Sequence, residues 1–411
     1  MEPIIKTYPN GLRLVVNPMQ NFKSVAFSML VMVGSGDEQP QEYGLSHYCE
    51  HMLFKGTKQR SGQQIIDELS MLSVDYNAWT SEDATCYHTK GIADNLEQCV
   101  DIFSDMYFNS QFTREDFDKE GDVIVQEIAM HEDSPMSVLF DQLNTTYFRG
   151  TKYEHPVAGY AEAIKRYQPD DVYHYLKKHY IAPNTIIGFA GDISLARAEA
   201  LVAKYFLPYF AQNQAAHKVR VNNTTLRPVA ANVSKKKDTE QQHVALVFPA
   251  CNQFDRDRHA LKLLKLILGG DMSSRLFINV REKLGLVYSI SAGVDLSDIG
   301  GYFVVLFSCT PKNTKKVIEV TKREIANLLA NGVQEQELIK VRNFCHVQKL
   351  FQAEKTVAVN ESNVTKLASL GEIMSAADEL ALIDGLTVAD LNQVAQKYLN
   401  VDLMTTVVVG K

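Results

Sequence analysis

The sequence has 411 residues, of which 45% are hydrophobic and 22% charged, and its formal net charge is −7. A chain of this size and composition exceeds one typical domain and can bury a sizeable core, so we expect a globular protein with more than one domain. The negative charge argues against nucleic acid as the main partner. The six cysteines form no CxxC pair, which favours free thiols in a reducing compartment.

The first residues, MEPIIKTYPNGLRLVVNPM, predict a strand and a turn around Pro9-Asn10-Gly11 rather than a signal peptide, a transit peptide or a membrane span. We therefore expect a cytoplasmic protein with no membrane span. Residues 25–33, VAFSMLVMV, form an apolar run of strand length that is bounded by glycines. A polar loop and a helical segment follow, so the sequence places that helix against a sheet.

The helical segment, residues 43–57, reads YGLSHYCEHMLFKGT and predicts an amphipathic helix with two different faces. One face is apolar and should enter the core, with Leu45, Tyr48, Cys49 and Met52. The other face repeats that spacing with His47, Glu50, His51 and Phe54. Lys55 supplies a cation to the last turn and Gly56 a left-handed cap, so we expect the helix to end there.

Two histidines four residues apart on a helix can direct their nitrogens at one point, where zinc accepts neutral imidazoles. Glu50 lies close enough to reach a zinc-bound water without being a ligand, which is the arrangement of a hydrolase. The pattern H-x-x-E-H is that of the inverzincins. Catalytic zinc keeps three protein ligands and an open position, so a third ligand must come from elsewhere. Without one, a charged helix surface is an equally good interpretation.

A second helical segment, residues 113–133, offers candidates for the third ligand. Thr113, with Asp116 three residues later, predicts its N-cap. Glu120 and Glu127 fall together on the flank of its apolar stripe. Two carboxylates beside a core face are costly unless a positive group meets them, so they too point to a site.

H-x-x-E-H followed seventy-six positions after His51 by Glu127, with Glu120 seven positions earlier, resembles the M16 (pitrilysin or insulinase) family of zinc peptidases. That family includes the mitochondrial processing peptidase and single-unit bacterial processing proteases. The resemblance implies one zinc ion per chain with three ligands, namely His47, His51 and Glu127. It also implies Glu50 as the general base and Glu120 as a carboxylate that orients a ligand or the water.

Residues 75–91 predict a hairpin with its turn at 81–83. Its first arm is similar to the family's edge strand near the zinc, where a substrate peptide can add as another strand, and it comprises Asn77, Ala78, Trp79 and Thr80. An ordinary edge strand is the alternative. Relatives usually carry glycines just before this strand, whereas this chain has Ser73-Val74-Asp75. His88 and His131 are not expected to be ligands, because a fourth would close the site to water.

Residues 212–225, QNQAAHKVRVNNTT, are polar and predict an interdomain linker. The segments on either side resemble each other in outline, so we expect a catalytic domain at residues 1–211 and a substrate-binding domain at 226–411. No H-x-x-E-H recurs in the second half. The expected fold class is α+β, with two homologous domains, each a mixed, mainly antiparallel sheet with helices on one face, as in M16-like metallopeptidases.

Residues 269–292 look like the family's C-terminal signature, with Arg281 on a helix and Tyr288 on the strand that follows. The resemblance implies that both reach the active site, hold the substrate backbone and stabilise the oxyanion, an effect of about 2.7–4 kcal/mol per donor. The alternative is a surface arginine and a half-buried strand tyrosine. Asp271 stands where the family commonly has glycine.

The sequence therefore predicts a zinc-dependent endopeptidase that hydrolyses peptides or unfolded segments inside an enclosed chamber. Larger family members join two such units as a clamshell, so this chain should form a homodimer or a heterodimer with a related M16 chain. The alternative function is a non-catalytic or regulatory subunit of a heterodimeric processing peptidase, although such relatives have usually lost part of the zinc motif. A structural zinc protein is disfavoured, because its site would have four ligands and no spare carboxylate.

Overall fold

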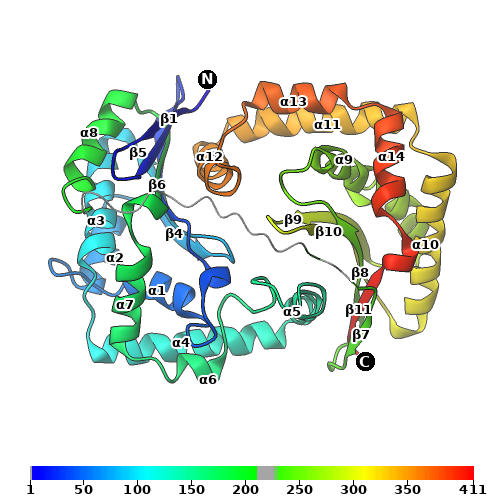
Figure 1. Ribbon diagram of the computed structural model, residues 1–411, viewed down its shortest axis with the longest axis horizontal. Coiled ribbons are helices and arrows are strands. Elements are labelled where there is room, and N and C mark those ends of the chain that lie inside the picture. The colour runs from blue at the N-terminus through cyan, green and yellow to red at the C-terminus, as the bar shows by residue number, and fades with distance from the viewer. Residues whose placement is uncertain (1, 211–225, 227–228) are drawn as a thin grey trace. The chain divides into compact units, whose positions relative to one another are not determined.

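The computed structural model describes residues 2–210, 226 and 229–411, which form two compact units (Figure 1). The first unit consists of residues 2–129, 155–210 and 350–375, and the second of residues 130–154, 226, 229–349 and 376–411. Each unit has its own sheet and its own hydrophobic core. The expected linker at residues 212–225 lies outside the described residues.

A six-stranded sheet in the order β1-β2-β6-β3-β5-β4 forms the centre of the first unit. Its strands are β1 (Ile4–Thr7), β2 (Arg13–Pro18), β3 (Ser24–Val31), β4 (Asp75–Thr80), β5 (Thr85–Ile92) and β6 (Thr185–Gly191). β2 and β6 are parallel, and all other neighbours are antiparallel. The predicted hairpin is thus β4 and β5, and β4 lies at an edge of the sheet.

One face of this sheet is covered by most of the unit's helices. They are α1 (Leu45–Leu53), α2 (Gly62–Met71), α3 (Leu96–Asn109), α4 (Arg114–Asp133), α6 (Ala161–Ile164), α7 (Pro169–His179) and α8 (Leu195–Tyr205). Aromatic rings fill the space between the two layers: Phe27 of β3 meets Phe103 of α3 edge-to-face at 5.8 Å and Phe189 of β6 at 5.1 Å. This packing fixes the helical layer to the central strands.

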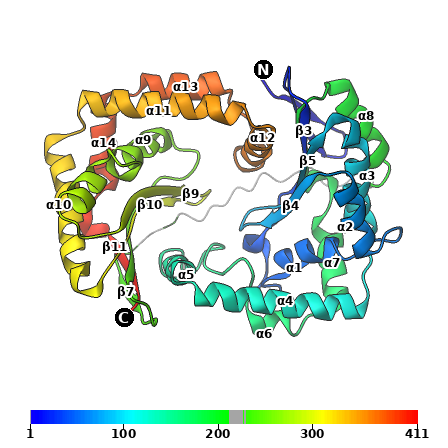
Figure 2. The same cartoon turned by 180° about the vertical axis from the view of Figure 1, so that it is seen from behind.

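The opposite face is covered by a helix from far along the chain, α12 (Thr356–Leu370), which Figure 2 shows beside β3 and β5. The buried cluster between them consists mainly of Val15, Leu30, Cys86, Ile186, Val364 and Leu367. Gly188 of β6 permits this close approach, because a Cβ there would lie 2.3 Å from Val364 Cγ1. Asn360 donates a hydrogen bond to Ser28 Oγ across the same contact, at 2.9 Å.

The second unit contains a five-stranded sheet in the order β7-β11-β8-β10-β9. Its strands are β7 (Asn232–Lys235), β8 (Gln242–Ala250), β9 (Ser289–Leu296), β10 (Gly301–Cys309) and β11 (Thr405–Val409). β7 and β11 are parallel and the other neighbours antiparallel. This order repeats β2-β6-β3-β5-β4 of the first unit, including the parallel pair, which confirms the expected duplicated α+β fold.

The helices of the second unit also cover both faces of its sheet. One layer contains α9 (Asp257–Gly269), a π-helical turn (Phe277–Glu282), α10 (Thr314–Asn331), α11 (Glu335–Ala353), α13 (Ala376–Gly385) and α14 (Val388–Tyr398). The other face is covered by α5 (Pro135–Tyr147), which buries Val138, Leu139 and Leu143 against β8, β10 and β11. Tyr147 Oη donates to the Gly301 carbonyl at 2.9 Å and ties this helix to β10.

The structure differs from the sequence prediction in how the sheets are covered. Helices were expected on one face only, yet α12 covers the second face of the first sheet and α5 that of the second. α5 lies within the expected domain 1–211 and α12 within 226–411, so each of the two units includes a helix from the other predicted range. The physical reason is that both sheets have apolar side chains on both faces. α13 was not predicted.

Among the described residues, all six cysteines are unpaired, as expected. No helix in the part of the chain that the structure describes has both the length and the apolar composition needed to cross a membrane.

Candidate metal centre

The site helix α1 is held at its N-terminus by a buried carboxylate, Glu38. Its two oxygens accept hydrogen bonds from the backbone N–H groups of Gly44 (2.8 Å) and Ser46 (2.7 Å) at the start of the helix, where N–H groups have no partner within the helix. Burial raises the pKa of Glu38 to about 8, against the effect of these hydrogen bonds. The two donors offset part of the effect of burial, and the Glu38 carboxyl group caps the helix through both of its oxygens.

The apolar face of α1 is buried as predicted, since Leu45, Tyr48, Cys49 and Met52 are at most 4% exposed. The predicted C-terminus needs correction. The helix ends at Leu53, and Gly56 does not form a left-handed cap. Gly56 has a φ of 142° and pairs with Ser61 in a β-bridge, so it turns the chain into the next loop. A Cβ on Gly56 would lie 2.9 Å from the carbonyl oxygen of Gln111.

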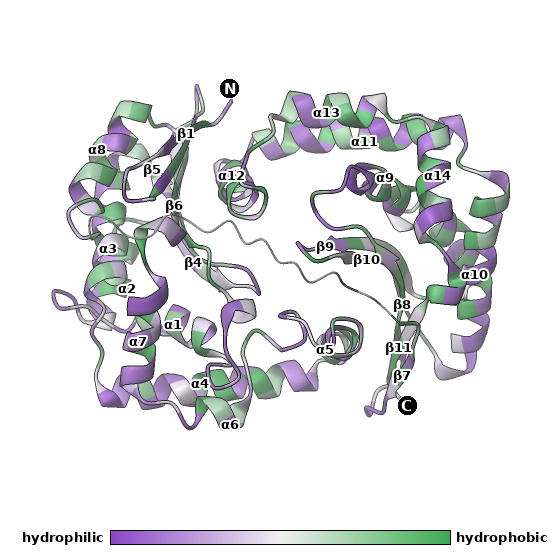
Figure 3. Cartoon of the chain, viewed as in Figure 1, coloured by the Kyte–Doolittle hydropathy of each residue, from purple (hydrophilic) through white to green (hydrophobic). Residues whose placement is uncertain are grey.

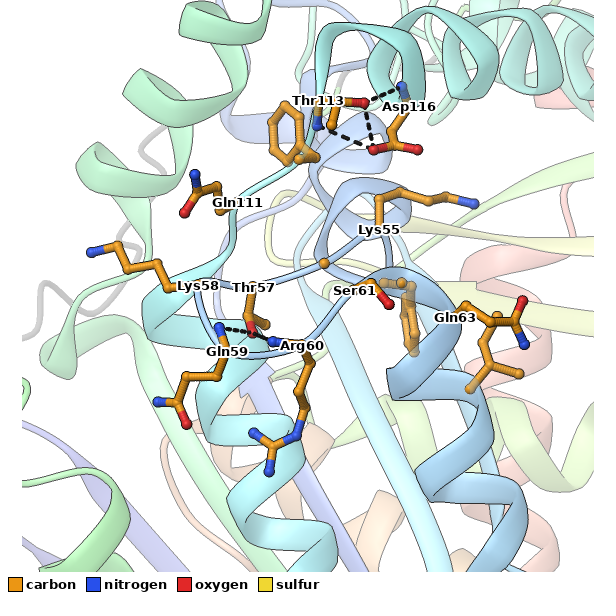
Figure 4. Close-up of a pocket in the computed structure, with 15 residues that line it drawn as sticks. Lys55, Thr57, Lys58, Gln59, Arg60, Ser61, Gln63, Gln111, Thr113 and Asp116 are labelled. Carbon is orange, nitrogen blue, oxygen red and sulfur yellow. Dashed lines mark hydrogen bonds between the residues drawn. The ribbon is translucent and has the colours of Figure 1, made fainter.

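The second site helix, α4, starts with the predicted capping pair. Thr113 Oγ1 accepts from the backbone N–H of Asp116 at 3.0 Å, and the Asp116 carboxylate accepts from the Thr113 N–H at 3.1 Å (Figure 4). The helix carries both hydrophilic and hydrophobic segments along its length (Figure 3). Its carboxylates can therefore flank a buried stripe, as the sequence indicated.

Close contact between α1 and α4 brings these carboxylates to the histidines. The Tyr48 ring of α1 stacks on Phe117 of α4 at 4.7 Å, and Tyr48 Oη donates to the Phe117 carbonyl at 2.7 Å. Gly121 leaves room for this contact, because a Cβ there would lie 2.7 Å from Tyr48 Oη. The apolar stripes of the two helices thus determine where their ionisable residues meet.

Three predicted ligands converge at this contact. Potential ligand atoms of His47, His51 and Glu127 all lie within 4.8 Å of one another. The two imidazole Nε2 atoms are 3.2 Å apart, and Glu127 Oε2 lies 3.5 Å from His51 Nε2 and 3.8 Å from His47 Nε2. Donor atoms around one tetrahedral zinc with bonds of about 2.0–2.1 Å are separated by roughly 3.3 Å, so the donor set fits that ion.

Glu120 fixes the orientation of one imidazole. Its Oε1 lies 2.7 Å from His51 Nδ1, which leaves His51 Nε2 directed at Glu127. The second oxygen, Oε2, forms an ion pair with Lys55 Nζ at 2.5 Å. Burial opposes ionisation of Glu120, but the hydrogen bonds to His51 and Lys55 outweigh it and lower its pKa. A carboxylate that holds the second ring nitrogen is a common support of metal-binding histidines.

Glu50 lies beside the three predicted ligands and has a different environment. Thr80 Oγ1 of β4 donates to Glu50 Oε2 at 2.5 Å. Burial raises the pKa of Glu50, and the Thr80 hydrogen bond and the charge of His51 offset part of that effect. A carboxylate with a raised pKa is suited to accept and return a proton. For His51, burial disfavours the charged form, but Glu120, Glu127 and Glu50 raise its pKa.

The edge strand β4 presents two kinds of residue. Thr80 faces α1 through its hydrogen bond to Glu50, and Ala78 packs beside the main core. Trp79 points to the other face, where it packs near α12. Asn77 is exposed and pairs in register with His88 of β5. Among the described residues, neither His88 nor His131 belongs to a metal-ligand cluster.

An open depression of about 730 Å³ adjoins the end of α1 (Figure 4). It is lined mainly by the loop of residues 55–61 and the start of α4. The predicted ligands and Glu50 are not part of its wall. The depression is therefore separate from the metal centre, although Lys55 lines it and also contacts Glu120.

Arg281 and Tyr288 lie in the second unit and contact each other there. The Arg281 guanidinium carbon lies 4.5 Å from the ring centre of Phe277 and 5.7 Å from that of Tyr288. Tyr288 is 78% exposed, which contradicts the half-buried tyrosine of the alternative interpretation. Arg281 lies on a π-helical turn rather than on the regular helix that we expected, and Tyr288 lies just before β9 rather than on the strand.

Comparison with known proteins shows the family to which the chain belongs. Residues 14–160 match the family described as insulinase (peptidase family M16), and residues 166–344 match the peptidase M16 inactive domain. An uncharacterized zinc protease of Streptomyces coelicolor is 31% identical over 396 residues, covering 96% of this chain and 86% of that protein. The chain belongs to the M16 peptidase family. The uncharacterized zinc protease YmxG of Bacillus subtilis is a further relative, 27% identical with 97% of each chain covered.

Solved structures confirm the M16 fold. A protease from Helicobacter pylori superposes with a TM-score of 0.92 at 22% identity, covering 100% of this chain and 99% of that one. A peptidase M16 inactive domain from Pseudomonas fluorescens superposes with a TM-score of 0.90 at 19% identity, covering 100% and 98%. The predicted family and the two-domain α+β fold are therefore confirmed.

Three contacts that support the M16 site were not predicted from the sequence, although Thr80 had been named as an edge-strand residue and Lys55 as the cation in the last turn of the helix. Glu38, Thr80 and Lys55 contact the start of α1, Glu50 and Glu120, respectively. Glu38 and Thr80 come from a loop and from an edge strand, so no local pattern links them to the motif. Lys55 carried a signal, because a cation one turn after His51 can reach the carboxylate that holds that histidine.

Proposed function

We propose that this M16 protein is a zinc-dependent endopeptidase that hydrolyses peptides or unfolded segments. The observation that carries the proposal is the convergence of His47, His51 and Glu127 within 4.8 Å, with Glu50 beside them but outside the ligand cluster. Three protein ligands and one spare carboxylate are the features of a catalytic zinc site, whereas a structural site has four ligands. Relatives named as zinc proteases support the same metal and reaction.

The chain's residues have distinct roles in this proposal. When bound, zinc lowers the pKa of a water ligand to about 7 and polarises a carbonyl oxygen. The Glu50 carboxylate takes the proton from the attacking water and delivers it to the leaving amine. Thr80 holds Glu50 Oε2, and within the described residues no hydrogen bond engages Oε1, which is the oxygen we assign to proton transfer.

We further propose that the substrate backbone pairs with the edge strand β4 at Asn77, Ala78, Trp79 and Thr80. Arg281 and Tyr288 would bind the substrate and stabilise the developing oxyanion. The contact of the Arg281 guanidinium with two aromatic rings supports this role, because it restricts the side chain before substrate arrives. Arg281→Ala should leave zinc content unchanged and lower turnover by roughly 10²–10³-fold. Arg323→Ala, an exposed arginine on α10, is the control, and normal turnover in Arg281→Ala would remove that residue from the site.

A single M16 chain would act as a homodimer or as a heterodimer with a related chain, enclosing the chamber, and would work in the cytoplasm. Light scattering of the purified chain distinguishes the two assemblies. A dimeric mass supports the homodimer, and a monomer that gains activity on addition of a second M16 chain supports the heterodimer.

The second candidate is a non-catalytic or regulatory subunit of an M16-type processing peptidase. The match of residues 166–344 to a family described as an inactive domain favours considering it. The intact cluster with Glu50 favours the enzyme, because a subunit without chemistry has no need of the spare carboxylate.

The test measures zinc content and cleavage of a mixed library of short peptides. We expect about one zinc per chain and cleavage in the wild type, zinc without cleavage in Glu50→Gln, and neither after treatment with a chelator. Glu50→Gln keeps the size of the side chain, so it isolates the loss of the base. Wild-type protein with bound zinc and no cleavage, alone or with a partner chain, would favour the subunit.

A further inference from the structure

The carboxylate of Glu120 contacts two basic side chains that differ in solvent exposure. Oε1 lies 2.7 Å from His51 Nδ1, on the side of the metal centre, and Oε2 lies 2.5 Å from Lys55 Nζ. The side chains of Glu120 and His51 are 10% and 15% exposed, whereas that of Lys55 is 34% exposed. A row of side-chain contacts therefore leads from the partly exposed Lys55 through Glu120 to His51, a predicted zinc ligand.

When a metal is bound, the negative charge of Glu120 is balanced by Lys55. A histidine that binds zinc through Nε2 is neutral, so it cannot balance the charge of Glu120. Among the described residues, only His51 and Lys55 form ion pairs with Glu120. A carboxylate that is this deeply buried is costly without a paired positive charge, and a bound metal would leave Lys55 as its one contacting cation.

The backbone places Lys55 for this contact. Its N–H donates to the Met52 carbonyl at 3.1 Å, which continues the last turn of α1, so the side chain starts one turn beyond His51. Figure 4 shows the Lys55 side chain extending away from Lys58, along the wall of the depression. Lys58 is exposed, and its side chain forms no hydrogen bond or ion pair with the described part of the chain. The two lysines thus differ in partner while sharing one loop.

We propose that Lys55 is a positioning residue of the metal centre. Its ammonium group holds the Glu120 carboxylate in one rotamer through the 2.5 Å contact, and Glu120 in turn accepts a hydrogen bond from His51 Nδ1 and aims Nε2 at the metal. This inference rests on the proposed function, because it assumes that His51 is a ligand. It goes beyond that function by assigning the centre's affinity to a residue that contacts no ligand directly.

The test measures zinc affinity by competition with a chelator, with no peptide present. Lys55→Met keeps the length of the side chain and removes its charge, so we expect zinc affinity to fall roughly 10–100-fold, the range typical of lost supporting contacts. Lys55→Arg should restore most of that affinity, because it returns the cation. Lys58→Met is the matched control and should bind zinc as the wild type does.

A double-variant comparison asks whether Lys55 acts through Glu120. Glu120→Gln removes the charge that Lys55 balances, so Lys55→Met should cost little or nothing further in that background. An equal loss from Lys55→Met in both backgrounds would overturn the proposal, since Lys55 would then act independently of Glu120. Unchanged affinity in Lys55→Met alone would overturn it as well.

The absorption spectrum of the cobalt-substituted protein provides a second readout. Lys55→Met and Glu120→Gln should shift the visible bands in the same way, because both change the orientation of one ligand. A general loss of stability would lower the melting temperature of the metal-free protein and leave the bands of the cobalt form unchanged, and that outcome would contradict the proposal. A wild type that binds no zinc would overturn the proposed function, which separates the two failures.

Discussion

The two units share the order of five strands and differ in the first helix after the strand at its centre, which is β3 in the first unit and β8 in the second. In the first unit this helix is α1, whose partly exposed face presents His47, Glu50 and His51. In the second unit it is α9, which presents Lys262 and Lys265 and keeps one histidine, His259. The shared sheet therefore does not create the site. A few positions on one helix face do, together with the carboxylates of α4.

The histidines of these two helices also experience opposite electrostatics. The pKa of His51 is raised, because the nearby carboxylates outweigh its burial. The pKa of His259 is lowered to about 4, first by burial and then by the charges of Arg258 and Lys262. The same residue type on equivalent helices is thus protonated more readily in the first unit and kept neutral in the second.

The largest expected effect is a loss of zinc affinity when a histidine is removed from α1 but not when one is removed from α9. His51→Ala should weaken zinc binding at least about 100-fold, because structural zinc sites gain roughly 10–16 kcal/mol from all ligands together, or about 3 kcal/mol from each. His259→Ala should leave zinc content unchanged. Both are measured by metal analysis after dialysis against a weak chelator. Zinc retained in His51→Ala, or lost in His259→Ala, would break the assignment of the metal to the first unit.

The second test concerns α12 and α5, each of which packs in the unit outside its predicted domain range. Leu367 of α12 and Leu143 of α5 are buried against the first and the second sheet, respectively. Each substitution to alanine should lower the free energy of unfolding by about 2–4 kcal/mol, measured by urea denaturation with circular dichroism. Only Leu367→Ala should alter the native fluorescence of Trp79, the chain's single tryptophan, which packs in the same cluster. A fluorescence change in Leu143→Ala instead would contradict the packing of α12 against the first sheet and of α5 against the second.

The third test uses pH and concerns the second unit. Because the pKa of His259 in the folded protein, about 4, is below that of the unfolded chain, its stabilising effect is present above pH 6.5 and is lost as the pH falls towards 4. After a discount for partial exposure, we expect a loss of about 1–2 kcal/mol. His259→Gln should flatten this part of the pH–stability curve. An unchanged curve would assign the acid sensitivity to other groups.

The smallest effects come from the turns that lead into the edge strands. Ser73 before β4 has a φ of 52°, and Gly285 before β9 has a φ of 58°. Both are left-handed, which costs a residue with a side chain about 1–2 kcal/mol. Ser73→Gly should therefore stabilise the protein by about 0.5–1 kcal/mol, and Gly285→Ser should destabilise it by about 1 kcal/mol, as measured by thermal unfolding. Shifts of the same sign in both variants would show that contacts, rather than backbone strain, dominate at these turns.

Ser73 is an example of a structural feature that the sequence indicated. The absence of glycine before β4 was noticed as a departure from the family, and the structure shows a serine in the conformation that glycine usually occupies. The site helices, the capping pair of Thr113 and Asp116, and the convergence of His47, His51 and Glu127 were also predicted from periodicity and resemblance. The helices and the capping pair depend on local spacing, which a single sequence contains, whereas the place of Glu127 beside the histidines came from the family resemblance.

The features that the sequence did not predict depend on contacts between residues far apart in the chain. The pairing of Thr80 with Glu50 spans a helix and an edge strand, and that of Asn360 with Ser28 spans most of the chain. Periodicity indicates that α12 has a buried face but not which sheet buries it. The continuous apolar run of β3 is compatible with burial on both faces, yet we expected helices on one face only.

The place of α12 in the chain has a consequence for biosynthesis. Residues 2–210 leave the ribosome long before residues 356–370, so the first sheet emerges with Val15, Leu30 and Ile186 still in contact with water. Domains generally fold as units during synthesis, and exposed apolar strands at that stage favour aggregation. The nascent first half must wait, or be shielded by a chaperone, until almost the whole polypeptide has been translated.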